Sequence, residues 1–483
     1  MNAVMKSQAV LVSAHAARLG LSVAIASLLG RNLAPADFGF VALVSSIFIV
    51  AGEILDMGTT AVATRAIGAQ PAHERDTLAS LLALRRLISL VVIAAVLGLA
   101  CSDYVALDGH RIVLAVTACA LSLLYLNAYQ LAFQVRQAYG QATALALAAQ
   151  LGFLLASAAA LRLRAGGAVI GLLVVAREIA QVLANRRVAV RMLGYRVRAP
   201  WRQPGMRTLL KAGWMIGAAG LSYKLATYAG GFLLWKMSAP EALGSFSAAQ
   251  QLLVPLAGVA WLFVTPLIAA MSAALAHDAA AFRVQLEGYV TLLLTISALI
   301  GAAGYFFAPY FLRLLYGELY ASGPWSAVGA FRWLALGYLF ALVSPALVVG
   351  EMVKGNALAL LFTATACLGI NLLANVLAIP TYGAEGAAMA LCASEAFMFV
   401  VLFARSAAGR DVRPGVAWLV YLAPAALLAA ALWMLSDLPL WQLAVACVWA
   451  PASLLMILHL PAQKACRASL ARTSTQWKLQ SAS

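Results

Sequence analysis

The chain has 483 residues, of which 64% are hydrophobic and only 10% are charged. Soluble globular proteins are roughly one-quarter charged, so this composition excludes an ordinary soluble domain and indicates a polytopic membrane protein. The net charge of +16 does not indicate a nucleic-acid partner, because the excess basic residues lie in short connections and in the tail.

The predicted elements are apolar runs of about 20 residues, each long enough to cross a bilayer as a helix. Lys6 precedes the first run as in a signal peptide, but Arg18 interrupts that run and no clear cleavage site follows, so we expect an uncleaved helix. The first block of predicted helices covers 8–30, 38–57, 81–101, 111–133, 142–162 and 166–185. The second block covers 212–235, 242–274, 285–309, 325–350, 356–379, 384–405, 415–435 and 439–461. The sequence therefore predicts an all-α fold with about fourteen transmembrane helices.

A strongly basic segment, 186–211, separates the two blocks and contains eight basic residues and no acidic one. Short loops rich in Lys and Arg resist export, so we interpret it as a cytoplasmic linker. It would act as a topological anchor on anionic headgroups or, alternatively, bind substrate phosphates. The expected organisation is an N-terminal lobe (1–185), the linker (186–211), a C-terminal lobe (212–407), two extra helices (408–461) and a basic cytoplasmic tail (462–483) whose last twenty residues look disordered.

The distribution of Arg and Lys predicts the orientation of the chain. With the N-terminus inside, the first inner connection would hold Arg65, Arg75, Arg85 and Arg86, and later inner connections are also basic. The outer connections are poorer in positive charge, so both termini are expected in the cytoplasm.

The two blocks also resemble each other. Ala34-Pro35-Ala36-Asp37-Phe38-Gly39 and Ala239-Pro240-Glu241-Ala242-Leu243-Gly244 both read A-P-x-x-[F/L]-G and lie 205 residues apart. The spacing from Gly140 to Gly171 recurs from Gly355 to Gly386. These two recurring sequence patterns predict two parallel six-helix repeats plus two extra helices, an architecture suited to alternating access.

Three stretches resemble one family. Residues 28–39 (LLGRNLAPADFG) are similar to the N-terminal signature of bacterial polysaccharide-export flippases, and 242–249 (ALGSFSAA) to the corresponding start of helix eight. Residues 371–388 (NLLANVLAIPTYGAEGAA) are similar to the family's N-x-x-x-N-x-x-x-I-P-x-x-G-x-x-G-A-A hallmark. The chain thus resembles the Wzx-like branch of the multidrug/oligosaccharidyl-lipid/polysaccharide exporter superfamily.

The resemblance implies two V-shaped lobes of helices in the bacterial inner membrane. It also implies a transporter that flips undecaprenyl-pyrophosphate-linked oligosaccharide for export of O-antigen, capsule or exopolysaccharide. Polysaccharide polymerase and glycosyltransferases are possible partners. No chemistry is needed for such transport, so we expect no catalytic residues.

Ionisable residues inside predicted spans are the candidate site residues, because a charge at mid-bilayer is costly and usually faces the bundle interior or water. Arg18 in the first helix and Lys224 in the seventh are candidate ligands for a pyrophosphate. The alternative is that each cation neutralises a buried acid. Glu53 and Asp56, one turn apart, are candidates for ion coupling because one of them could hold a proton, or else they pair with Arg18 or Arg65.

Two further acids, Glu178 and Glu395, lie in the last helix of each predicted repeat and are candidate cavity charges. Arg177 is the expected internal partner of Glu178, unless it lies at the membrane interface. The scattered cysteines and histidines form no CxxC, HxxxH or HExxH motif, and the chain has no GxxxxGK loop. We therefore expect no metal, no cofactor and no nucleotide hydrolysis.

Three other functions compete with the flippase. A drug or cation antiporter of the same superfamily should have a cavity dominated by acids, whereas Arg18 and Lys224 are basic. A membrane polymerase or ligase of the same pathway typically needs a sizeable periplasmic loop, and the predicted spans leave none. A purely structural scaffold would not need buried charges in several helices.

Overall fold

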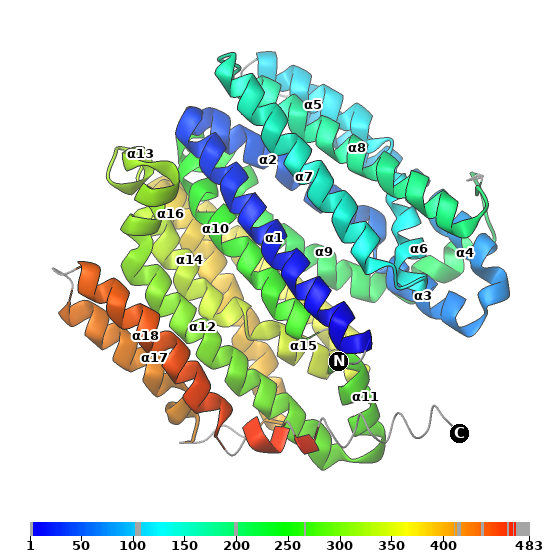
Figure 1. The fold of residues 1–483 in the computed structure, drawn as a ribbon. Helices are drawn as coiled ribbons and strands as arrows, with labels where there is room; N and C mark the ends of the chain where they lie inside the picture. Colours follow the sequence, from blue (N-terminus) through cyan, green and yellow to red (C-terminus); the bar gives the residue numbers. More distant parts are fainter. Residues whose placement is uncertain are drawn as a thin grey trace. The chain divides into compact units, whose positions relative to one another are not determined.

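The structure, a computed structural model, describes residues 3–101, 108–197, 201–264, 267–409, 411–412, 417–435, 439–460, 463–466 and 468–469. These residues form α-helices and short 3-10 turns joined by brief connections (Figure 1). The chain groups into two compact units, called here the N-terminal unit (Met1–Gln251) and the C-terminal unit (Leu252–Ser483). This division falls inside a helix. The lobe limits predicted from the sequence remain a prediction.

The N-terminal unit contains nine α-helices within its described residues and the start of a tenth. They are α1 (Ala3–Asn32), α2 (Pro35–Asp56), α3 (Thr59–Ala69), α4 (Glu74–Cys101), α5 (Asp108–Leu121), α6 (Gln130–Val135), α7 (Tyr139–Arg162), α8 (Gly167–Leu193), α9 (Gly205–Met237) and α10 (Pro240–Val264), with 3-10 turns η1 (Pro71–His73) and η2 (Leu124–Tyr129). Within this unit α1 lies against α7, and α2 packs on α8 and α9 (Figure 1).

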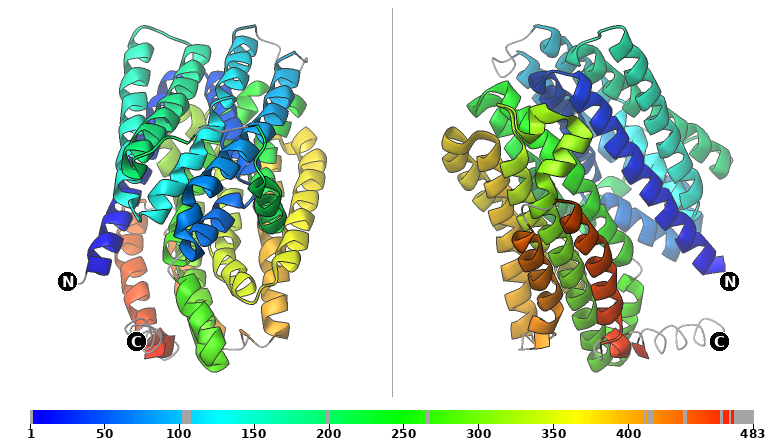
Figure 2. Two further views of the ribbon diagram at one scale, coloured as in Figure 1. Left: turned by 90° about the vertical axis from the view of Figure 1, so that its right-hand side faces the viewer. Right: turned by 60° about the vertical axis from the view of Figure 1, so that its left-hand side comes forward.

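The C-terminal unit begins inside α10 and, within its described residues, contains eight further α-helices. They are α11 (Leu267–His277), α12 (Ala279–Tyr316), α13 (Glu318–Ala321), α14 (Val328–Ala341), α15 (Ser344–Val353), α16 (Ala357–Ala408), α17 (Ala417–Met434) and α18 (Pro439–Leu458). Here α14 packs between α12 and α16, and α17 and α18 run side by side along α12 (Figures 1 and 2). The last contact is apolar, with Phe307 of α12 and Leu428 of α17 in one buried cluster.

The helices are those of a polytopic membrane protein. Among the described residues, seven helices are long and apolar enough to cross a membrane, or eight if the bent pair His110–Leu121 and Leu124–Val135 is one span. Each of the fourteen spans predicted from the sequence overlaps a helix or a pair of helices. Large apolar side chains cover the outer surface, with Val91 70% and Leu377 68% exposed. Lipid accommodates such a surface, whereas water does not.

The longest helical segment, α16, is two helices folded back on each other. Gly383 has φ 51°, a conformation that favours glycine, and it follows Pro380 in the I-P-x-x-G-x-x-G part of the hallmark. On either side of this turn, Asn371 donates a hydrogen bond to Ser394 Oγ at 3.1 Å, which requires the chain to reverse between them. The two spans predicted at 356–379 and 384–405 are therefore both present.

The basic linker is more helical than the sequence suggested. Helix α8 continues through Arg186, Arg187 and Arg191 and ends at Gly194, whose φ of 73° forms a left-handed C-cap. The connection to α9 is held on α4, where the Arg86 guanidinium lies 3.7 Å from the ring centroid of Trp201.

The tail is also more ordered at its start than expected. Gln463 and Ser469 are both buried in the C-terminal unit. Gln463 donates to the Gly288 carbonyl at 2.6 Å, and Gln285 donates to Ser469 Oγ at 3.1 Å, so both tail residues dock on α12. Of the two, Ser469 belongs to the last twenty residues, for which disorder was predicted. The rest of the prediction for residues 470–483 lies outside the described residues.

The repeated A-P-x-x-[F/L]-G turns occupy equivalent positions and touch each other within the N-terminal unit. Pro35 begins α2 and Pro240 begins α10. A Cβ at Gly39 would lie 2.7 Å from the Gly244 nitrogen, and a Cβ at Gly244 would collide with the Pro35 backbone. The glycines at matching positions of the two turns are therefore required by this close approach.

Candidate functional site

The backbone at the end of α2 packs directly against the backbone of α9, a contact called here the α2–α9 seam. This contact positions the residues of the candidate site. Met57 and Gly58 both adopt positive φ, 40° and 70°, which breaks the helix between α2 and α3. A Cβ at Gly58 would lie 2.6 Å from the Gly213 carbonyl oxygen, and a Cβ at Gly217 would collide with the Met57 backbone. Gly213 and Gly217 of α9 thus permit close packing of the two backbones, and this packing brings the polar end of α2 against α9.

Glu53 lies on this seam, beside Lys224. A Cβ at Gly220 of α9 would lie 2.6 Å from Glu53 Oε1, so the carboxylate rests on the helix where a side chain is missing. Lys224 follows Gly220 by one helical turn, and its charge acts on Glu53, as does the charge of Asp56. The structure therefore brings together three residues that the sequence singled out in two separate helices.

Asp56 forms an ion pair with Arg85 of α4. Arg85 is only 5% exposed, and its Nη2 also donates a hydrogen bond to Thr60 Oγ1 at 2.5 Å. The Thr60 hydroxyl in turn donates to Asp56. Glu53, Asp56, Thr60, Arg85 and Lys224 are called the ionic cluster below; with all four charged groups ionised, it is electrically neutral.

The sequence interpretation placed Arg85 in an inner connection, which the structure corrects. Helix α4 begins at Glu74, with acidic residues Glu74 and Asp76 in its first turn, so Arg85 lies three turns inside it. Acidic residues near a helix N-terminus are favoured by the helix dipole. That signal was present in the sequence and would have moved the start of the helix back. Asp56 pairs with this arginine, not with the Arg18 or Arg65 that were considered.

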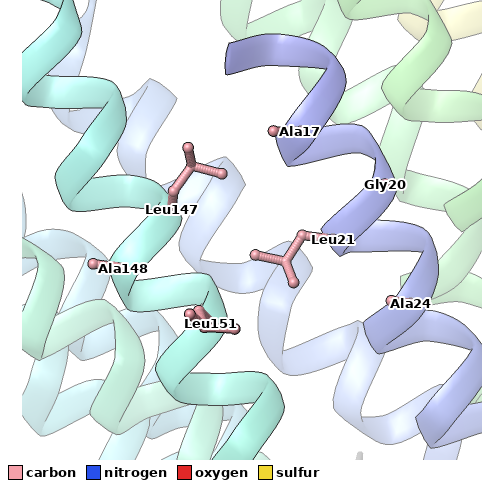
Figure 3. Close-up of a pocket in the computed structure, with 7 residues that line it drawn as sticks. All are labelled: Ala17, Gly20, Leu21, Ala24, Leu147, Ala148 and Leu151. Atoms are coloured by element: carbon pink, nitrogen blue, oxygen red, sulfur yellow. The ribbon is translucent and has the colours of Figure 1, made fainter. Parts of the chain in front are cut away.

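Arg18 lies elsewhere in the N-terminal unit. Its side chain is exposed on α1, and it forms no ion pair with any residue that the structure describes. Beside it an open groove of about 470 Å³ runs between α1 and α7. Figure 3 shows the apolar lining of this groove, with Ala17, Gly20, Leu21 and Ala24 on α1 and Leu147, Ala148 and Leu151 on α7.

The two remaining predicted acids are also separate from the ionic cluster. Glu178 pairs with its neighbour Arg177, as expected, and the Arg177 guanidinium lies 5.1 Å from the centroid of the Phe153 ring. Glu395 is buried in α16 of the C-terminal unit, 5% exposed, where its charge acts on Cys367 and Cys392. Among the described residues, no group of three or more His, Cys, Asp or Glu side chains could hold a metal ion.

The hallmark asparagines form a buried ladder near Glu395. Asn375 donates to both the backbone and the side-chain oxygen of Asn371 at 2.8 Å, and Asn371 donates to Ser394. These polar groups bind one another across the two halves of α16. They serve helix packing.

Solved structures share this fold. The chain aligns with the lipid II flippase MurJ in an inward closed conformation with a TM-score of 0.72 and 12% identity, covering 94% of this chain and 98% of that one. An inward-facing multidrug resistance transporter of the MATE family and MOP superfamily aligns with a TM-score of 0.57 and 13% identity, covering 82% and 96%. A mutant of the Vibrio cholerae MATE transporter VcmN aligns with a TM-score of 0.52 and 15% identity, covering 84% and 96%.

The proteins that share the fold are named as flippases and transporters. No curated protein sequence matches the chain significantly. The family model for polysaccharide biosynthesis proteins matches residues 4–273, a stretch that contains the whole ionic cluster and both repeated turns. That match covers more than half of the chain, and this protein is therefore a member of the polysaccharide biosynthesis protein family.

Proposed function

We propose that this protein flips an undecaprenyl-pyrophosphate-linked oligosaccharide across the bacterial inner membrane for polysaccharide export. The family and the fold support a membrane transporter that acts on a lipid-linked substrate. The observation that carries the proposal further is the ionic cluster, in which Arg85 pairs with Asp56 and Lys224 lies near enough to Glu53 for its charge to act on that carboxylate. Ionisable residues inside transmembrane segments are energetically costly, so they usually mark a functional site.

The cluster can bind an anionic head by exchanging partners. Lys224 faces Glu53 across the α2–α9 seam and remains partly exposed. A pyrophosphate oxygen would replace the Glu53 carboxylate as the anion nearest Lys224. Protonation of Glu53 would leave the cluster with one net positive charge, which would offset one of the two negative charges of the pyrophosphate. Arg85 is enclosed and bonded to Asp56 and Thr60, so it holds Asp56 in position and does not itself reach the substrate. Arg18 supplies a second, exposed cation on α1.

Alternating access would then carry the head across the membrane while the prenyl chain stays in lipid. The repeated turns at Pro35 and Pro240 support such a mechanism, because parallel repeats supply two related bodies that can rock against each other. The membrane potential or an ion gradient supplies the energy. Glycosyltransferases would supply the substrate, a polymerase would consume it, and both termini would lie in the cytoplasm.

The test uses a deletion strain that accumulates lipid-linked sugar on the cytoplasmic leaflet. Lys224→Ala and Arg18→Ala should abolish export while protein level and membrane insertion stay normal. Arg162→Ala, which removes an exposed charge at the end of α7, is the matched control and should export normally. Arg18→Lys should recover only part of the activity, because an ammonium lacks the guanidinium fork. Normal export by Lys224→Ala would reject the proposed role of the ionic cluster.

A second experiment separates substrate binding from simple neutralisation of an acid. If Lys224 only balances Glu53, then Lys224→Gln should lower the melting temperature, and Glu53→Gln added to it should restore both stability and export. If Lys224 binds the head, the double variant should be stable and still inactive. No such double variant is needed for Arg18, because it forms no ion pair with any residue that the structure describes.

A drug or cation antiporter is the second candidate, because Glu53 and Asp56 would bind a cation and the fold is shared with MATE transporters. That function predicts that expression of this protein protects cells against cationic drugs. It also predicts that Glu53→Gln abolishes the protection while Lys224→Gln preserves it.

A further inference from the structure

A groove between the linker-side ends of α7 and α8 lies outside the ionic cluster. It has a volume of about 570 Å³ and is open to one side. Its lining residues follow one face of each helix: Gln141, Ala144 and Leu145 on α7, and Val188, Arg191 and Met192 on α8. Residues spaced three and four apart lie together on a helix, so each helix presents a continuous wall.

The length of α8 places this groove at the level of lipid headgroups. The helix has 27 residues and is therefore about 40 Å long, which is close to the full thickness of a bilayer with its headgroups. Between the exposed Arg164 and Arg186, the only charged residues are the paired Arg177 and Glu178. The hydrocarbon core thus ends near Arg186, and Arg191 lies more than a turn beyond it.

The chemistry of the groove changes along its walls. Ala144, Leu145, Val188 and Met192 are apolar, whereas Arg191 and Gln141 are exposed and polar. Tyr139, 43% exposed, begins α7 in the way that aromatic residues often mark the interface. An apolar wall that ends in a guanidinium and an amide fits an acyl chain that ends in a phosphate.

The charge around the groove favours an anion. Arg186 and Arg187 are exposed on the same end of α8, and Glu178 is the only acidic residue in 139–197. That acid is already paired with Arg177. Within the described part of the chain, no ion pair involves Arg186, Arg187 or Arg191. Basic pockets between transmembrane helices are a recurrent way of binding anionic lipid headgroups.

We propose that the α7–α8 groove is a binding site for an anionic phospholipid of the surrounding bilayer. The phosphate lies between Arg191 and Gln141, with Arg186 and Arg187 adding to the field, and one acyl chain lies along Ala144, Leu145, Val188 and Met192. The assignment is independent of what the protein transports, because it rests only on these two helix ends.

The test measures lipids bound to the purified full-length protein by native mass spectrometry during titration with phosphatidylglycerol or phosphatidylcholine. Wild type should bind phosphatidylglycerol more tightly. Arg191→Gln should weaken that binding about fivefold, since one basic residue near an anionic surface contributes about 1 kcal/mol. Arg191→Lys should retain most of the affinity, and Ala144→Phe should weaken it by filling the apolar wall without changing the charge.

Arg162→Gln is the matched control, because it removes an exposed charge from the opposite end of the same helix pair. The melting temperature of each variant in detergent confirms that the fold is intact. An equal loss of phosphatidylglycerol affinity in Arg191→Gln and Arg162→Gln, or no loss of affinity in Ala144→Phe, would overturn the assignment of this site. A competing result is also defined: undecaprenyl diphosphate displaces phosphatidylglycerol at equimolar concentration, and Arg191→Gln abolishes the binding of undecaprenyl diphosphate. That result would assign the groove to the substrate and reject the phospholipid.

Discussion

Arg85 shows how one buried cation organises the acids around it. Its guanidinium is enclosed in α4 and bonded to Asp56 and Thr60, so removing it leaves Asp56 without its partner. Breaking one side of a buried pair typically costs about 3–5 kcal/mol, whereas replacing both partners by apolar groups is often neutral. We expect Arg85→Leu to lower the melting temperature by several degrees and Arg85→Leu with Asp56→Leu to recover most of the loss. A double variant no more stable than Arg85→Leu would show that the pair is not the main contribution of Arg85.

The ion pairs of Lys354 in the C-terminal unit predict that the stability of the fold depends on pH. It lies beyond the end of α15, bonded to Glu351 and, at 2.7 Å, to Asp411. Burial alone would lower the pKa of Lys354, but its bonds to Asp411 and Glu351 outweigh burial and raise the pKa above its ordinary 10.5. A cation with a raised folded-state pKa stabilises the fold fully below its unfolded pKa and loses that contribution as pH rises through the folded value.

Lys354→Met should therefore lower the melting temperature across neutral pH, where wild type keeps the full contribution of the ion pairs. It should also reduce the loss of stability that wild type undergoes above about pH 10. The measurement is the melting temperature of both proteins in detergent from pH 7 to pH 11. If the curves of melting temperature against pH were parallel for the two proteins, the contribution assigned to the Lys354 ion pairs would be contradicted. Lys211→Met, at an exposed lysine of α9, is the control and should leave the curve unchanged.

At the scale of elements, the α2–α9 seam depends on glycine. A Cβ at Gly217 would collide with the Met57 backbone, which has no flexible end to move aside. Gly217→Val should therefore destabilise the protein by about 1–3 kcal/mol or more and should displace Lys224 from Glu53, so that export falls as well. Gly152→Ala in α7 is the control: nothing lies within 4 Å of the added carbon, and the change should be neutral or slightly stabilising. Export and melting temperature that are equal in the two variants would exclude a tight seam.

The helices themselves could be predicted from the sequence because each apolar run is long enough to fix its own structure. Both halves of α16 and the turn at Gly383 were accessible from the hydropathy and the I-P-x-x-G pattern. Helix α3 was not, because the break at Met57 and Gly58 lies against the backbone of α9, and the local sequence does not encode that tertiary contact. The extension of α8 past residue 185 was missed for another reason: basic residues end an apolar run without ending a helix.

The candidate site could be predicted only in part, because a sequence identifies charged residues in a helix but not their partners. Glu53, Asp56 and Lys224 were singled out, and the structure brings them together. Arg85 was missed because it was counted with the basic residues of an inner connection, although it lies within the predicted span 81–101 and inside α4. Its pairing with Asp56 depends on how α2 and α4 pack, which no local pattern encodes.

At the scale of the whole molecule, the repeated turns predict that the two repeats run in the same direction through the membrane. The chain enters α2 and α10 through the same turn, with Pro35 and Pro240 each in the first helical position. Parallel repeats require an even number of crossings between these points, and six predicted spans separate the start of the first repeat from the start of the second. Parallel repeats would put the linker on the same side as the N-terminus, and the excess of basic residues in 186–211 predicts that this side is the cytoplasm.

Reporter fusions test this topology directly. Alkaline phosphatase, active only when exported, should be inactive when fused after Gln203 and active when fused after Arg164 or Asp437. A fluorescent protein that folds only in the cytoplasm should give the opposite pattern at the same three positions. The pair of positions at Arg164 and Gln203 is separated by α8 alone among the described helices, so opposite signals there establish that α8 crosses the membrane. An exported reporter at Gln203 would mean that the first block crosses an odd number of times, and it would remove the parallel repeats on which the alternating-access proposal rests.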